Sequence, residues 1–339
     1  MGTIKAIKPL GFHWETINPF IFCAYHQDDF PQGKANLGPD HKYLKNRLLG
    51  NDFTKKDGFR MYHGQTVPGF PFHPHAGFET ITLVEEGFAD HTDSLGSCGR
   101  FGQGDVQWMT AGKGVLHSEM FPLVHQNKPN PLVLFQLWLN LPKASKQVNP
   151  HYKMLWHEEI PVVSIQQNQQ IVGQIKIIAG HYQNIKALSP TPDSWAANPE
   201  NEVQIWRITL QAGAEFVIPK AKAPKLNRQL FFYKGDSINV LNQSISSGHS
   251  LELSPSERIE ITAKNHTAEF LFLQAKPINE PVVQHGPFVA NSSHEINTII
   301  KNYQQTQFGG WPWPEAEFTH GLNPRRFAKY PDGSTEEKS

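Results

Sequence analysis

The chain of 339 residues has few cysteines, no excess of charge of either sign and no long hydrophobic run. Its two cysteines, Cys23 and Cys98, are too few for a disulfide framework and lack the spacing of a cysteine-based zinc site, which fits a reducing compartment. No segment is long and apolar enough for a signal peptide or for crossing a bilayer. We therefore expect a cytoplasmic protein that has no membrane partner.

Lysine and arginine together number 31, as do aspartate and glutamate, so the net charge is zero. Basic residues do not gather in runs, which argues against direct contact with nucleic acid. The sequence also lacks a P-loop, a GxGxxG motif, a serine nucleophile elbow and a cysteine–histidine pair in a convincing context. These absences exclude the common nucleotide-binding and hydrolase classes.

Helical periodicity is scarce as well, whereas short apolar runs bounded by turn residues recur along the chain. An aromatic content of 11%, with 26 glycines and 26 prolines, suits β-rich packing with many turns. The clearest helix is expected from Ser293 to Thr306, with Ser292 or Ser293 as its N-cap. The apolar runs predict strands over residues 18–25, 78–87, 104–112, 131–141, 203–210, 214–219, 228–234, 237–241 and 268–275.

This pattern of strands occurs twice, over residues 20–142 and 160–276, with a polar connector between them. We therefore predict an all-β fold of two β-barrels in tandem with a short C-terminal helix. The expected domains are residues 1–145 and 146–339. Residues 36–66 and 164–200 are polar and lack periodicity, which predicts a long loop and a crossover. The tail after Gly321 is expected to be frayed.

Four residues form two pairs with the same spacing. His73 and His75 lie in HPHAGFET, and His117 and Glu119 lie in GKGVLHSE. The i, i+2 spacing puts both members of a pair on one face of a strand. Two such strands side by side would bring three imidazoles and a carboxylate to one point, which predicts a metal site. Without thiolates, this set suits Fe(II), Mn(II), Ni(II), Cu(II) or Zn(II), and four protein ligands leave two positions open on a six-coordinate ion.

Other polar residues near these pairs have more than one interpretation. Glu79 follows His75 by four residues and is either a ligand or, as we prefer, a supporting residue for a ligand histidine. His91 and Asp93 form another i, i+2 pair. We prefer to interpret this pair as a hairpin-edge feature, and a pair of metal ligands is the alternative. Several residues near the site are either core or the lining of a pocket for a planar ligand: Phe78, Trp108, Met109, Phe135 and Gln136.

Outside the two pairs, we expect Asp90, Asp105 and Glu85 to be solvated charges at strand ends. Trp311 and Trp313, which are flanked by prolines, are expected to fix a terminal segment to the body of a domain. The second set of strands, over residues 160–276, contains no HxH or HxE pair. If both halves share a fold, only the first retains metal chemistry.

Four segments, HPHAGFETIT, GDVQWMTAGKGVLHSEM, PVVQHGPFV and FGGWPW, occur in the order found in the pirins. The chain resembles this family of bicupins, which belongs to the cupin superfamily, over most of its length. The resemblance implies that the first cupin barrel binds one metal ion and that the second is metal-free. Fe(II) is the expected ion, with Mn, Ni, Cu or Zn as alternatives. The ligands implied are His73, His75, His117 and Glu119.

The resemblance also implies a function. We expect a metal-dependent dioxygenase that opens the ring of a quercetin-type flavonol with O2, and Glu119 is the expected catalytic base. The alternative is a metal- or redox-dependent regulatory protein that binds a transcription factor or a metabolic enzyme. A bicupin with a purely structural metal is a third possibility.

Overall fold

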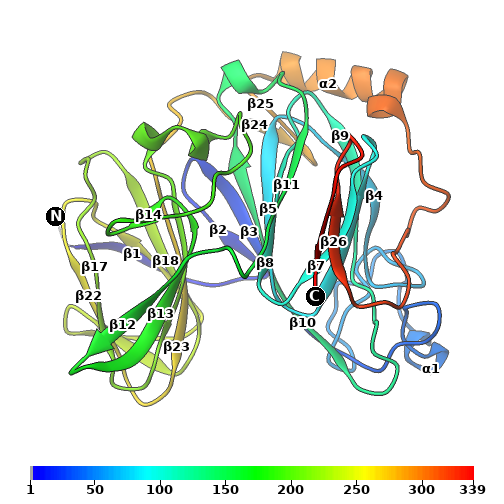
Figure 1. Cartoon of the computed structure of the whole chain (residues 1–339). Helices are drawn as coiled ribbons and strands as arrows, with labels where there is room; N and C mark the ends of the chain where they lie inside the picture. The colour runs from blue at the N-terminus through cyan, green and yellow to red at the C-terminus, as the bar shows by residue number, and fades with distance from the viewer. Residues whose placement is uncertain (1–2) are drawn as a thin grey trace. The chain divides into compact units, whose positions relative to one another are not determined.

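The computed structural model describes residues 3–339, which form two compact units (Figure 1). Unit 1 comprises the residues up to Cys23 together with Glu158–Asn279, and unit 2 comprises Ala24–His157 and Glu280–Ser339. Both units are built from antiparallel strands, so the predicted all-β class is confirmed. No helix among residues 3–339 is long and apolar enough to span a membrane.

Unit 2 contains two antiparallel sheets that face each other. One has the strand order β11-β8-β5-β10-β3 and the other the order β27-β26-β7-β6-β9-β4. His91 on β6 stacks on Tyr152 of β11, with 4.8 Å between ring centroids, so side chains of the two sheets meet inside the unit. The strands are β3 (Phe20–Phe30), β4 (Gly69–His75), β5 (Phe78–Glu86), β6 (Phe88–Asp93), β7 (Cys98–Gly102), β8 (Asp105–Thr110), β9 (Val115–Met120), β10 (Asn130–Asn140), β11 (His151–Leu155), β24 (Val283–His285), β25 (Phe288–Ala290), β26 (Arg326–Lys329) and β27 (Thr335–Lys338).

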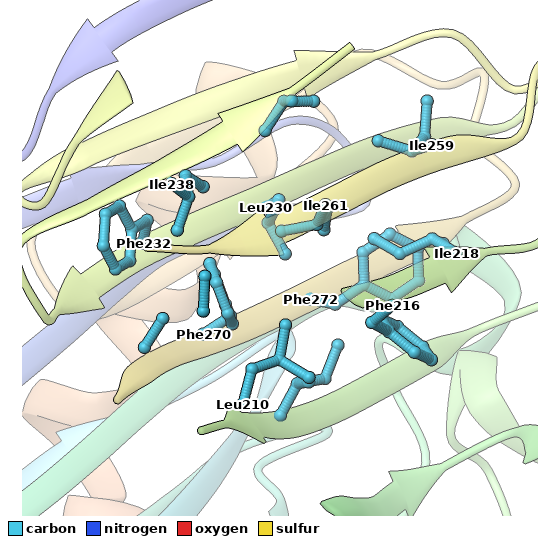
Figure 2. Close-up of a cluster of buried hydrophobic side chains, with 14 of the residues drawn as sticks. Leu210, Phe216, Ile218, Leu230, Phe232, Ile238, Ile259, Ile261, Phe270 and Phe272 are labelled. Atoms are coloured by element: carbon cyan, nitrogen blue, oxygen red, sulfur yellow. The ribbon is translucent and has the colours of Figure 1, made fainter. Parts of the chain in front are cut away.

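Unit 1 has a seven-stranded sheet, β1-β21-β18-β23-β16-β13-β12, and a four-stranded sheet, β17-β22-β19-β20. Its strands and short helices are β1 (Ile4–Pro9), β2 (His13–Glu15), β12 (Val162–Gln167), β13 (Gln170–Ala179), β14 (His181–Tyr182), β15 (Ile185–Lys186), η2 (Trp195–Ala197), η3 (Pro199–Asn201), β16 (Gln204–Leu210), β17 (Glu215–Ile218), β18 (Asn227–Lys234), β19 (Ser237–Val240), β20 (Gln243–Ser246), β21 (His249–Leu253), β22 (Ile259–Ala263) and β23 (Ala268–Ala275). Aliphatic and aromatic side chains from both sheets fill the space between them, among them Phe216, Phe232 and Phe270 (Figure 2).

The chain is not divided into the two units at a single boundary at residue 145, because each unit contains two separate segments. The N-terminal strand β1 pairs with β21, so the first residues belong with Glu158–Asn279. After Asn279 the chain returns to unit 2, where it adds β24, β25, β26 and β27. This arrangement depends on strand pairing between residues more than two hundred positions apart, for which the local sequence pattern gives no signal.

The segment after Gly321 is not a frayed tail, contrary to expectation, because it forms β26 and β27. β26 pairs with β7 and extends its sheet (Figure 1). The Arg326 side chain is buried. The two tryptophans do attach a terminal segment to unit 2, as predicted. Trp311 stacks on Phe72 with 5.0 Å between centroids, and Trp313 Nε1 donates to the Asp93 carbonyl at 2.8 Å.

Asp90 and Asp105 are buried, so the expectation that they are solvated is wrong. Each accepts hydrogen bonds from a buried arginine: Arg100 reaches Asp90 at 2.7 Å, and Arg326 reaches Asp105 at 2.8 Å. The sequence pattern placed these carboxylates at exposed strand ends, but the C-terminal segment covers them. This segment also supplies Arg326, one of the two arginines.

Residues 36–66 form a packed loop that contains one short helix, α1 (His41–Leu44). The Arg47 side chain is buried in this loop, where it donates to Asp52 at 2.7 Å and lies over the Phe59 ring at 4.0 Å. The predicted C-terminal helix is confirmed as α2 (Ser293–Thr306), with the Ser292 side chain accepting from the Glu295 amide; two short helices, η1 (Lys143–Ser145) and η4 (Gln307–Gly309), complete unit 2.

Gly77 and Gly96 allow a test of how tightly the segment after β4 is packed. Both have a φ of +86°, but a Cβ at Gly77 would lie 1.8 Å from the Val289 carbonyl oxygen, whereas a Cβ at Gly96 would have open space. We expect Gly96→Ala to cost about 1 kcal/mol through backbone strain alone. Gly77→Ala should cost roughly 3 kcal/mol or more, because the backbone of β25 must move. The midpoints of urea unfolding measure the difference, and equal midpoints would contradict this packing.

Candidate metal centre

The register of β4 against β9 brings the two predicted pairs together. The strands are antiparallel, and His73 lies directly opposite His117. Side chains alternate along each strand, so His75 and Glu119 lie on the same face as the opposed pair. The pairing contains one irregularity, between Phe70 and His73, where the register shifts before the first histidine. The sequence spacing therefore predicts the face correctly.

The three histidines form a compact triad. Their ring centroids are 4.7 Å apart for His73 and His75, 4.5 Å for His73 and His117, and 4.7 Å for His75 and His117. One ligand atom from each lies within 4.8 Å of the ligand atoms of the other two. His75 and His117 are buried, while His73 is partly exposed, so the triad is closest to solvent at His73.

Burial keeps these imidazoles neutral. It lowers the pKa of His73 to about 4, despite an opposing hydrogen bond with the Pro71 carbonyl. The pKa of His75 and that of His117 are also lowered, mainly by burial and further by the neighbouring histidines. Neutral imidazole is the form that binds a metal ion, so the site is in its ligand state at neutral pH.

The donor atoms of the triad fit a metal ion. His73 Nδ1 lies 2.9 Å from the Pro71 carbonyl oxygen and so carries the proton, which leaves the Nε2 lone pair free. That Nε2 is 3.1 Å from His75 Nε2, close to the spacing of about 3 Å for two nitrogens that share one ion at right angles. Both ring nitrogens of His117 are buried without a hydrogen-bond partner among residues 3–339. Such groups normally have a partner, which an ion would supply.

Glu119 lies beside the triad. Its Oε2 is 3.8 Å from His117 Nε2. Two neutral donors fix the carboxylate: Thr82 Oγ1 donates to Oε1 at 3.1 Å, and Gln136 Nε2 donates to Oε2 at 2.6 Å. Burial raises the pKa of Glu119, whereas His91 and the two donors oppose that shift. The carboxylate thus has fixed donors on one side and the histidines on the other.

Glu79 faces the opposite side of β5. Thr82 contacts Glu119, and because side chains alternate along a strand, residue 79 must point the other way. Glu79 Oε1 accepts from Trp108 Nε1 at 3.1 Å and from Thr110 Oγ1 at 2.8 Å. These contacts connect it to β8, on the face away from the triad, so it does not have the ligand-supporting position that we expected.

The residues considered as pocket lining divide into two groups. Phe78 lies against His75, at 5.0 Å between ring centroids, and Gln136 contacts Glu119, so both belong to the site. Trp108 lies on the Glu79 side, and Met109 packs in a buried apolar cluster. Phe135 packs against Tyr25, at 4.9 Å between centroids. Core packing is thus the better description of these last three.

His91 and Asp93 lie at the β6–β7 hairpin, as the sequence suggested, and Asp93 Oδ1 accepts from the Leu95 and Ser97 amides at 2.9 Å. Both residues of the pair are fully buried on β6, where His91 lies opposite Glu119 and Asp93 opposite His117. His91 Nε2 lies 3.2 Å from Asp93 Oδ2, and the His91 ring centroid is 5.5 Å from that of His117. The pair therefore lies directly beside the triad. Its i, i+2 spacing, the same as in the two ligand pairs, was the signal for this location.

The segment after His75 is fixed by residues from distant parts of the chain. The Ala76 amide donates to the Pro287 carbonyl at 3.3 Å, and the Val289 amide donates to the Ala76 carbonyl at 3.0 Å. The buried Lys146 Nζ donates to the Gly77 carbonyl at 2.8 Å. Burial lowers the pKa of Lys146 to about 8. No sequence signal identified these contacts, because each joins residues far apart in the chain.

Comparison with known proteins agrees with this fold. Residues 6–139 match the family Pirin, and residues 205–309 match the Pirin C-terminal cupin domain. A Vibrio cholerae protein named "Putative quercetin 2,3-dioxygenase" is 35% identical over 242 residues, which cover 71% of this chain and 80% of that protein. The pirin of Rattus norvegicus is 31% identical over 287 residues, which cover 80% of this chain and 85% of the rat protein.

Among solved structures, a quercetin 2,3-dioxygenase of Acinetobacter baumannii superposes with a TM-score of 0.70. The alignment covers 91% of this chain and 98% of that one, at 23% identity, so it shows the fold alone. Two facing-sheet units, with a histidine triad in one of them, define a two-domain cupin. The chain belongs to the pirin family, as its motifs predicted.

The lowered pKa of His73 predicts a pH effect on the metal-free protein. An unfolded histidine binds a proton below about pH 6.5, whereas folded His73 does so only below about pH 4. Stability should therefore fall as the pH decreases from 6.5 towards 4, by on the order of 1–2 kcal/mol for this residue at pH 5. Urea midpoints at pH 7 and pH 5 measure the effect.

The matched variants are His73→Gln and His285→Gln, since His285 is exposed on β24 of the same unit. The first should lose less stability between pH 7 and pH 5 than the parent protein, and the second should lose as much. An undiminished loss in His73→Gln would contradict the assignment of this shift to His73.

Proposed function

We propose that the protein is a metal-dependent dioxygenase that opens the ring of a quercetin-type flavonol with O2. The observation that carries the proposal is the triad of neutral histidines, with His73 partly exposed and one fixed carboxylate beside it. We propose His73, His75, His117 and Glu119 as the residues that hold the ion, with Fe(II) preferred and Mn, Ni, Cu or Zn as alternatives.

A bound ion would supply Lewis acidity at the coordination positions that the protein leaves open. Glu119 would accept the proton of the flavonol 3-hydroxyl group, because it is the carboxylate next to the triad and burial raises its pKa. Thr82 and Gln136 would hold it in place during this transfer. Ring opening then consumes one O2 and releases carbon monoxide and a depside ester.

The names of relatives support this reaction class. The Vibrio cholerae relative and the Acinetobacter baumannii structure are both named for quercetin 2,3-dioxygenase chemistry. The site's chemistry favours catalysis over a purely structural ion, since a structural ion is normally enclosed by its ligands. Here one of the three histidines, His73, is partly exposed.

Metal reconstitution tests the proposal directly. The metal-free protein is loaded separately with Fe(II), Mn(II), Ni(II) and Cu(II), and the flavonol absorbance and O2 consumption are followed under air. We expect turnover with at least one ion, with equal amounts of flavonol and O2 consumed. Bound metal without turnover for any of the four ions would reject the dioxygenase and favour a regulatory role instead.

Glu119→Gln tests the base assignment, with Glu79→Gln as its matched control. Both carboxylates are buried in unit 2, but only Glu119 is on the triad side of the sheet. We expect Glu119→Gln to lower kcat/KM by about 10²- to 10⁴-fold, and Glu79→Gln to change it by less than tenfold. The metal content of each variant is measured alongside. Full activity in Glu119→Gln would show that this residue is not the base.

A further inference from the structure

The Gln136 side chain joins the metal centre to a tryptophan. Its Nε2 donates to Glu119 Oε2 at 2.6 Å, and the same nitrogen is 3.4 Å from Thr82 Oγ1. At the other end of the amide, Gln136 Oε1 accepts from Trp138 Nε1 at 3.2 Å. Residues 136 and 138 are two apart on β10, so both side chains emerge on one face of the sheet.

The chemistry of the indole decides which way the amide points. An indole N–H can only donate, so it must face the oxygen of Gln136 and not the nitrogen. The amide N–H2 is then directed at Glu119, where an oxygen would instead meet a second oxygen at 2.6 Å. The indole thus anchors the far end of the amide and restricts its rotation.

Trp138 itself is held firmly. It is buried and stacks on Phe78, with 4.0 Å between ring centroids, and its ring lies edge-on to His75 at 5.2 Å. The indole position is therefore set by packing, which makes its N–H a fixed reference point for Gln136. Trp138 thus contacts the His75 ring directly and the Glu119 carboxylate through the Gln136 amide.

We propose that Trp138 is a positioning residue of the metal centre, which acts through Gln136 to hold the Glu119 carboxylate beside His117. The inference rests on the proposed metal centre and deepens it. It assigns no contact with the ion to Trp138 or Gln136. What it requires is that loss of the indole N–H loosens Glu119 and weakens metal binding, since partners that orient metal ligands commonly contribute 10- to 100-fold to affinity.

The experiment uses Co(II) as the probe, because its visible spectrum reports the ligand geometry and titration gives its Kd without any need for turnover. We expect Trp138→Phe to raise the Kd for Co(II) about tenfold and to alter the spectrum. Replacing the indole with benzothienylalanine at position 138 keeps the two fused rings and removes only the N–H. This variant should show the tenfold increase in Kd even if Trp138→Phe proves unfolded.

A double-variant cycle separates positioning from packing. Gln136→Met should raise the Kd about 10- to 100-fold, and adding Trp138→Phe should raise it no further, because the indole has no amide left to hold. Trp108→Phe is the matched control. It removes an indole hydrogen bond of similar length, the 3.1 Å bond from Trp108 Nε1 to Glu79, on the other face of the sheet. This variant should leave the Kd for Co(II) unchanged.

Three outcomes overturn the inference. One is an unchanged Kd in both position-138 variants. Another is a Kd in the double variant that rises by the product of the fold-changes of the two single variants. The third is a parent protein that binds no Co(II), which would remove the metal centre as well. Failure of flavonol turnover together with the expected Kd pattern would reject the dioxygenase and support the role of Trp138.

Discussion

The antiparallel pairing of β4 with β9 is the constraint on which the rest of the site depends. It places His73 opposite His117, and strand alternation then puts His75 and Glu119 on the same face. A shift of one residue in either strand would turn that strand's pair of side chains to the other face of the sheet, away from the second pair. Much of the surrounding structure preserves this register. A Cβ at Gly114, just before β9, would lie 2.4 Å from the Phe308 ring, so the aromatic ring packs directly on that backbone.

Concentrating polar groups inside a barrel carries an energetic cost, and the two units handle it differently. Unit 1 fills the space between its sheets with apolar side chains (Figure 2). Unit 2 instead buries His75, His91, His117 and Glu119 between its sheets. Burial disfavours the charged form of each imidazole, and unpaired buried nitrogens lose their contacts with water. A bound ion would compensate for both effects, so metal binding and folding stability should be coupled in unit 2.

The convergence of the three histidines and the fold class could be predicted from the sequence because both depend on local periodicity. The i, i+2 spacing fixes the shared face whatever the rest of the chain does, and the alternating runs identify the strands. The same reasoning undervalued His91 and Asp93, since spacing gives the face of a strand but not its burial. It missed the order of the segment after Gly321 and the burial of Asp90. These depend on pairings such as β26 with β7, which bring together residues that no local pattern connects.

The discontinuity of unit 2 has a consequence for how the protein is made. The ribosome produces residues 24–157, then all of Glu158–Asn279, and only then Glu280–Ser339. The first stretch contains all three histidines, but the backbone partner of Ala76 lies on β25, in the last stretch. Unit 1 can fold while the nascent chain is still attached, apart from unit 2. The backbone contacts that hold Ala76 form only after the last stretch has been made, so the candidate metal centre is complete only when nearly the whole chain has been synthesised.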